Sequence, residues 1–105
     1  MDILQSIKNN IDLILKEKAP SAQLILFGSR ATGMASISSD YDFMVIVSDD
    51  TLLKERKIIA AEIRRSLAKI DIDADVIVKS KKSFEELKRF PGNVCRWADA
   101  SGVPV

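Results

Sequence analysis

Apolar residues recur along this chain at two different spacings, which together predict helices alternating with strands. Near the N-terminus they lie three or four positions apart, as on one face of an amphipathic helix. The members of this first set are Ile3, Leu4, Ile7, Ile11, Ile14 and Leu15. The same spacing predicts the buried face of a later long helix, formed by Ile59, Ile63, Leu67 and Ile70.

Short apolar runs of strand length lie before and after the second helical set. Residues 22–27 are mostly apolar and predict a strand that is buried on both faces. Residues 41–47 and 72–78 predict two further strands.

Prolines and glycines set several boundaries between these elements. Pro20 closes the first helix, and Gly28 breaks the first strand. Residues 29–34 are expected to form a short helix that ends at Gly33, and the small polar residues 35–39 indicate a loop.

Polar residues with capping ability mark the starts of the later helices. Asp49 or Asp50 is expected to cap the second long helix. Ser83 with Glu86 resembles a capping box for the helix that follows, and Ser80 is an alternative start.

The order of these elements predicts the fold class. Helices are expected over residues 2–18, 29–34, 51–69, 84–89 and 93–100, with strands over 22–27, 41–47 and 72–78. The order α-β-α-β-α-β-α-α predicts an α+β fold with α/β-like alternation, in which helices flank a small mixed β-sheet. A length of 105 residues fits one domain over residues 1–105.

The composition narrows the classes of partner and compartment. The 16 basic and 15 acidic residues leave a net charge of +1, so no direct binding of nucleic acid is expected. The apolar runs are far shorter than the ~20 residues of a membrane span, so no membrane association is expected. The single cysteine, Cys95, excludes an internal disulfide and favours a cytoplasmic location; we expect it to be a buried, inert thiol.

Histidine is absent from the chain, which restricts the chemistry further. Ser-His-Asp and Cys-His catalysis and His-bearing zinc sites are excluded. If the protein is an enzyme, carboxylates therefore carry the reaction.

The Gly28-Ser29 pair is the first candidate for ligand binding. A strand that ends in Gly-Ser at the start of a helix presents backbone N–H groups and a hydroxyl to one point, where an anion fits. Glycine also permits close approach to the backbone. The alternative is an ordinary turn between a strand and a helix. Arg30 follows and can contact a phosphate or pair with an acid.

Asp40 and Asp42 are the first candidate metal ligands. Residues two positions apart in a strand project from the same face, so both carboxylates can reach one cation. All-oxygen ligation suits Mg²⁺, with Mn²⁺ as an alternative. The competing interpretation is that Asp40 belongs to a loop and caps the start of the strand.

A third group of acids precedes and begins the later strand. Strict alternation places Asp71, Asp73 and Asp75 on one strand face, where a cation would relieve their repulsion. A solvent-facing surface of an edge strand is the alternative. Trp97, in the last helix, is interpreted as part of the core or of a partner surface.

Three motifs taken together are much more specific than their parts. The segments PheGlySerArgAlaThrGly, SerAspTyrAspPhe and AlaAspValIleVal resemble the nucleotidyltransferase superfamily typified by DNA polymerase beta. The short length and the GlySerArgAla-Xaa-Gly form resemble its minimal nucleotidyltransferases, the MNT domains, including MntA-type antitoxins of HEPN/MNT toxin–antitoxin pairs. The resemblance runs from about residue 22 to the C-terminus.

The resemblance implies transfer of a nucleoside monophosphate from a nucleoside triphosphate to a hydroxyl, with two Mg²⁺ ions. Gly28, Ser29 and Arg30 would bind the nucleotide. Asp40 and Asp42 would bind both metal ions. Asp75 would bind the second ion and help to activate the acceptor hydroxyl, with Asp73 as its rival for this role.

The resemblance also implies a partner. Many MNT domains resemble antitoxins that pair with a HEPN-type toxin and neutralise it, in studied members by adding AMP to a tyrosine. ATP and a HEPN-type toxin are therefore the expected substrate and partner. A non-catalytic antitoxin that masks its partner by contact is the main alternative. Transfer to a small molecule with the help of a separate subunit is a further one, and homo- or hetero-oligomers are compatible with each.

Overall fold

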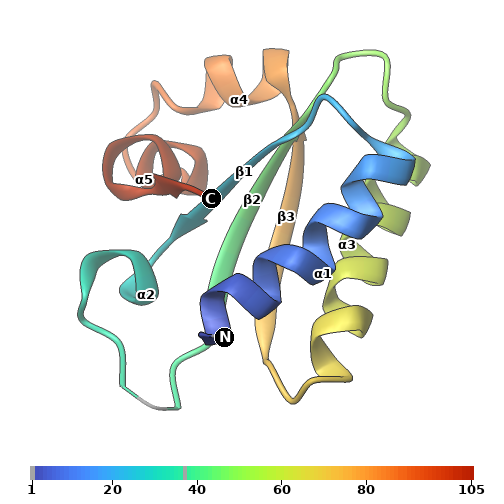
Figure 1. Ribbon diagram of the computed structural model, residues 1–105. Coiled ribbons are helices and arrows are strands. Elements are labelled where there is room, and N and C mark those ends of the chain that lie inside the picture. Colours follow the sequence, from blue (N-terminus) through green and yellow to red (C-terminus); the bar gives the residue numbers. More distant parts are fainter. Residues whose placement is uncertain (1, 37) are drawn as a thin grey trace.

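A mixed β-sheet stands at the centre of the computed structural model, which describes residues 2–36 and 38–105 (Figure 1). The elements follow in the order α1 (Ile3–Lys18), β1 (Gln23–Phe27), α2 (Ser29–Thr32), β2 (Tyr41–Val47), α3 (Leu53–Ala68), β3 (Ala74–Ser80), α4 (Lys81–Leu87), α5 (Val94–Ser101) and β4 (Val103–Pro104). The strand order is β3-β2-β1-β4. The predicted α+β class and mixed sheet are confirmed.

The directions of the strands follow from their connections. β1 is antiparallel to β2 and to β4. β2 and β3 are parallel, and α3 makes the crossover that a parallel pair requires. β3 is an edge strand of the sheet, and it follows α3, one of the two helices that cover the same face.

Helices cover both faces of the sheet, as Figure 1 shows. Side chains alternate along a strand, so β2 sends Phe43, Val45 and Val47 to the core shared with α1 and α3. It sends Met44 and Ile46 to a second core shared with α4 and α5. This double burial explains the unbroken apolar run over residues 43–47.

The apolar faces predicted for α1 and α3 are buried in the middle of each helix. The prediction is wrong at the start of α1 and at the end of α3. Ile3 at the start of α1 is exposed. Ile70 was expected to be buried, but α3 ends at Ala68 and Ile70 is 38% exposed. The backbone N–H groups of Ile70 and Ile72 both donate to the Leu67 carbonyl, so the chain leaves the helix before Ile70 completes the apolar face.

The predicted cap of α3 is also wrong. The N-cap is Leu52, which makes no side-chain capping bond. Asp49 instead accepts a hydrogen bond of 2.8 Å from the Lys82 N–H in the first turn of α4. Ser80, the alternative start, caps α4 through a bond from the Ser83 N–H, so β3 extends to Ser80 and the helix begins earlier than expected.

The short strand β4 was not expected and holds α5 in place. It pairs with β1 at Ile25 and Leu26. A Cβ on Gly102, between α5 and β4, would collide with the Ala98 carbonyl oxygen and with the Ile25 side chain. Glycine therefore lets α5 pack closely over β1. No helix within residues 2–36 and 38–105 is long and apolar enough to cross a membrane.

Candidate active site

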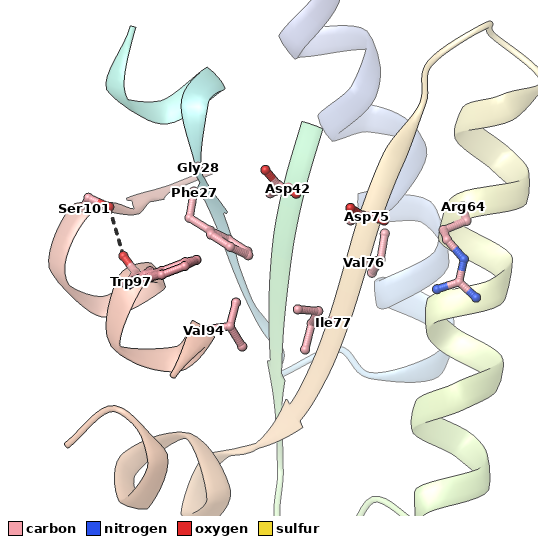
Figure 2. Close-up of a pocket in the computed structure, with 10 residues that line it drawn as sticks. All are labelled: Phe27, Gly28, Asp42, Arg64, Asp75, Val76, Ile77, Val94, Trp97 and Ser101. Carbon is pink, nitrogen blue, oxygen red and sulfur yellow. Dashed lines mark hydrogen bonds between the residues drawn. The ribbon is translucent and has the colours of Figure 1, made fainter. Parts of the chain in front are cut away.

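Asp42 and Asp75 lie side by side on adjacent strands. In the register of the sheet Phe27 pairs with Asp42, and Asp42 pairs with Asp75, so the three residues form one row across β1, β2 and β3. Register partners on parallel strands project from the same face of a sheet. Both carboxylates line one cavity on the face that α5 covers (Figure 2).

This main cavity has a volume of about 600 Å³ and two chemically different parts. Its acidic part is formed by the two carboxylates beside the Gly28 turn. Its apolar part is formed by side chains from β1, β3 and α5. The full lining is Phe27, Gly28, Asp42, Arg64, Asp75, Val76, Ile77, Val94, Trp97 and Ser101. A cavity of this size fits a small-molecule ligand.

The negative charge of Asp42 is unfavourable because the carboxyl is partly buried and lies near other acids. Burial is the main cause that raises the pKa of the Asp42 carboxyl above its ordinary value of 3.8, and the negative charges of Asp75 and then Asp40 add to it. A cation between the carboxylates would remove this penalty. Mg²⁺ usually takes one or two carboxylates and completes its shell with water and phosphate oxygens. The pair therefore fits a divalent cation bound together with a nucleotide.

Only glycine fits at position 28, because of its backbone conformation and because the Asp42 side chain lies against it. Its backbone has φ +74° and ψ −159°, a conformation that is essentially restricted to glycine. An ideal Cβ at this position would lie 3.2 Å from Asp42 Cγ and closer still to Oδ2. The sequence predicted close approach of a ligand at this glycine, and the structure adds close approach of a catalytic candidate.

Ser29 and Arg30 begin the short helix α2, which spans Ser29–Thr32 and ends at Gly33 as expected. The Arg30 guanidinium donates from Nε and Nη2 to the Ser39 carbonyl at 3.2 and 2.9 Å. It also stacks over the Tyr41 ring at 4.4 Å from the centroid. Arg30 thus holds the end of the loop that leads into β2.

Asp40 and Asp73 lie in a neighbouring pocket of about 300 Å³, together with Arg30 and Tyr41. Asp40 directly precedes β2 and is exposed. Asp73 precedes β3, and its carbonyl accepts the Tyr41 N–H at 3.0 Å. The structure therefore brings Asp42 and Asp75 together in the main cavity and places Asp40 and Asp73 beside it.

The predicted alternation of acids before β3 is wrong for the first two residues. The strand begins at Ala74, and Asp71 adopts a positive φ of 60° in the preceding turn. Asp75 is the member that joins the strand. In the described part of the chain, no group of three or more carboxylate, thiol or imidazole side chains is arranged to hold a metal ion.

Arg64 and Trp97 are among the cavity-lining residues that the sequence did not mark as site residues. Arg64 is exposed on α3, and its side chain extends toward the edge strand β3 at the rim of the cavity (Figure 2). Trp97 was interpreted as core or partner surface, and it is 59% exposed in the wall formed by α5. No local signal could have found them, because both positions depend on which helix covers which part of the sheet.

Comparison with known proteins identifies the family. The model of the nucleotidyltransferase domain family matches residues 8–92. A protein of Methanocaldococcus jannaschii, provisionally named a protein adenylyltransferase, is 39% identical over 82 residues, which cover 77% of this chain and 80% of that protein.

Solved structures show the same fold. A chain of a toxin–antitoxin complex with AMP-PNP superposes with a TM-score of 0.62 and 26% identity, covering 92% of this chain and 70% of that chain. A chain of the complex of the tri-AMPylated HEPN toxin with its MNT antitoxin, from Shewanella oneidensis, has a TM-score of 0.57 and 20% identity, covering 95% and 69%. The second likeness concerns the fold alone. The family match and the archaeal relative together show that this chain belongs to the nucleotidyltransferase domain family and is a nucleotidyltransferase.

Proposed function

We propose that this domain transfers AMP from ATP to a hydroxyl group of a partner protein in a metal-dependent reaction. The single observation that carries this proposal is the Asp42–Asp75 pair, whose carboxylates face one cavity beside the Gly28 turn. Like charges so close together require a cation or a proton, and the transfer of a nucleotidyl group requires a cation at the phosphates.

Each residue of the site has a proposed role. Asp42 and Asp75 would hold the metal, with Asp40 as a third ligand because its charge already acts on Asp42. Bound Mg²⁺, with two ions expected, would neutralise charge on the attacking and leaving oxygens. Gly28, which lines the cavity, and Ser29, which follows it, would form the turn that binds the triphosphate.

The other polar groups position the reactants. Asp75 is exposed on the edge strand β3, where it can accept the proton of an acceptor hydroxyl that approaches from outside. Arg30 was expected to bind the nucleotide. Since its guanidinium holds the Ser39 carbonyl, we assign it to fixing the loop that presents Asp40.

A protein acceptor is favoured by the relatives. The archaeal relative is provisionally named a protein adenylyltransferase, and the 26% identical chain comes from a toxin–antitoxin complex with AMP-PNP. An antitoxin that acts on a HEPN-type toxin is therefore the specific form of the proposal. Masking of the toxin by contact alone is the second candidate, favoured by the position of Asp40 outside the main cavity.

The proposal is tested by incubating the protein with α-³²P-ATP and Mg²⁺, with and without the product of the neighbouring gene. Label on the partner, with an added mass of one AMP and none in the Asp42→Asn variant, is the expected result. Tight binding of the two proteins without any label, and neutralisation that survives Asp42→Asn, would contradict transfer and support masking.

A further inference from the structure

We infer that Trp97 forms the stacking platform for the base of the nucleotide, an inference that rests on the proposed function. Trp97 is the single tryptophan of the chain, and it lies 59% exposed on α5. The same residue lines the main cavity together with Asp42 and Asp75. Exposure alone does not mark a site, since Phe90 is equally exposed; the place of Trp97 in the cavity wall is what leaves its indole face open to a planar ligand in this cavity.

The two parts of the cavity match the two parts of a nucleoside triphosphate. The carboxylates and the Gly28 turn form the part that suits metal-bound phosphates. Next to this part, Phe27 begins an apolar wall that continues to Val94 and Trp97 on α5. Figure 2 shows the indole directed from α5 into the space between this helix and the sheet. A planar base attached to those phosphates would meet this wall.

The indole is carried by a fixed helix, as a binding platform requires. Cys95 and Ala98, its neighbours along α5, are 0% and 1% exposed and anchor the helix in the second core. The Asn93 side chain caps the helix through the Cys95 N–H at 2.9 Å. The Ser101 hydroxyl donates to the Trp97 carbonyl at 3.0 Å. The helix that carries Trp97, and with it the position of its backbone, is thus set before any ligand arrives.

Stacking accounts for base binding without any selective hydrogen bond. Every base presents a π-face, so an indole platform binds bases with little discrimination. Replacement of a stacking aromatic residue by alanine weakens binding by about 5-fold to 150-fold. The loss should concern only ligands with a base, because the phosphates bind at the other part of the cavity.

The test measures Mg²⁺-dependent binding of ATP and of inorganic tripolyphosphate to the full chain by calorimetry. Trp97→Ala should weaken ATP binding by about fivefold or more and leave tripolyphosphate binding unchanged. Trp97→Phe should restore most of the ATP affinity. Phe90→Ala is the matched control, because Phe90 is 58% exposed in the segment between α4 and α5, and its loss should change neither ligand.

Fluorescence provides a second readout that does not depend on a variant that folds. Because Trp97 is the only tryptophan, ATP stacked on it should quench the intrinsic emission of the wild type, whereas tripolyphosphate should not. Unchanged emission under saturating ATP, or equal ATP affinity of wild type and Trp97→Ala, would overturn the inference. So would a Trp97→Ala protein that binds ATP normally and no longer binds the partner, which would make Trp97 a docking residue.

These outcomes separate the inference from the proposed function. Quenching that depends on the base, without transfer of label to any partner, would support the stacking role of Trp97 and refute the transferase proposal. Transfer that proceeds with an unchanged KM for ATP in Trp97→Ala would refute the platform and leave the transferase proposal standing.

Discussion

Asp42 on β2 and Asp75 on β3 are register partners in the parallel pair of the sheet, and both carboxylates open into the same cavity. The two acids, at positions 42 and 75, are 33 positions apart in the chain. The crossover through α3 brings them together. Burial, and then the negative charge of Asp75, raise the pKa of the Asp42 carboxyl, so ionised Asp42 carries a cost to folding.

Replacement of Asp42 by asparagine should stabilise the metal-free protein at neutral pH. A carboxyl whose pKa is raised on folding carries no penalty below its ordinary value of 3.8, and the penalty grows as the pH rises through the folded-state pKa. The gain in melting temperature of Asp42→Asn over wild type should therefore be seen at pH 7 and vanish near pH 3.5, with a chelator present throughout.

Gly28→Ala should abolish nucleotidyl transfer, whereas Gly33→Ala should preserve it. Both glycines have positive φ values, +74° and +78°, but only at Gly28 would a Cβ collide with the Asp42 carboxylate. Gly33→Ala should cost about 1 kcal/mol of unfolding free energy from left-handed backbone strain. Thermal melts and transfer assays on both variants measure the two effects. Equal activity of the pair would remove the Gly28–Asp42 contact from the mechanism.

Asp75→Asn should retain ATP binding and lose transfer, and Asp73→Asn should retain both. Asp75 lies in the main cavity, whereas Asp73 precedes the strand and lines the neighbouring pocket. Binding by calorimetry and transfer by labelling of the acceptor test the assignment. Loss of transfer in Asp73→Asn with normal transfer in Asp75→Asn would show that the other acid is the functional one.

Arg30→Lys should lower kcat with little change in the KM for ATP. A lysine cannot reproduce both hydrogen bonds to the Ser39 carbonyl or the stacking over Tyr41, so the loop before β2 would loosen. Hydrogen exchange should accordingly rise for the backbone of the loop. A rise in KM at constant kcat, with unchanged exchange, would instead indicate direct contact of Arg30 with the nucleotide.

Ile63→Ala should destabilise the domain by about 2–5 kcal/mol, because Ile63 is fully buried and the substitution leaves a cavity. Ile70→Ala removes an equal side chain, which is 38% exposed, and should cost well under half of that amount. Urea denaturation of the two variants measures the difference. Similar losses would mean that Ile70 belongs to the core, as the sequence pattern suggested.

The sequence alone was sufficient where local physics decides the structure. The apolar run over residues 41–47 predicted β2 to the residue, and Gly28 and Gly33 marked both ends of the short helix. The absence of histidine left carboxylates as the reactive groups, and the joint motif indicated the family that the comparisons confirm. These features depend on backbone conformation and side-chain chemistry within a few residues.

Only the tertiary structure decided which residues meet. Asp75, and not Asp73 or Asp71, shares a cavity with Asp42, because β3 begins at Ala74 and pairs with β2 in one particular register. Trp97 faces that cavity because β4 pairs with β1 and seats α5 over the sheet. Register and helix placement arise from packing between segments far apart in the chain, which local patterns do not encode.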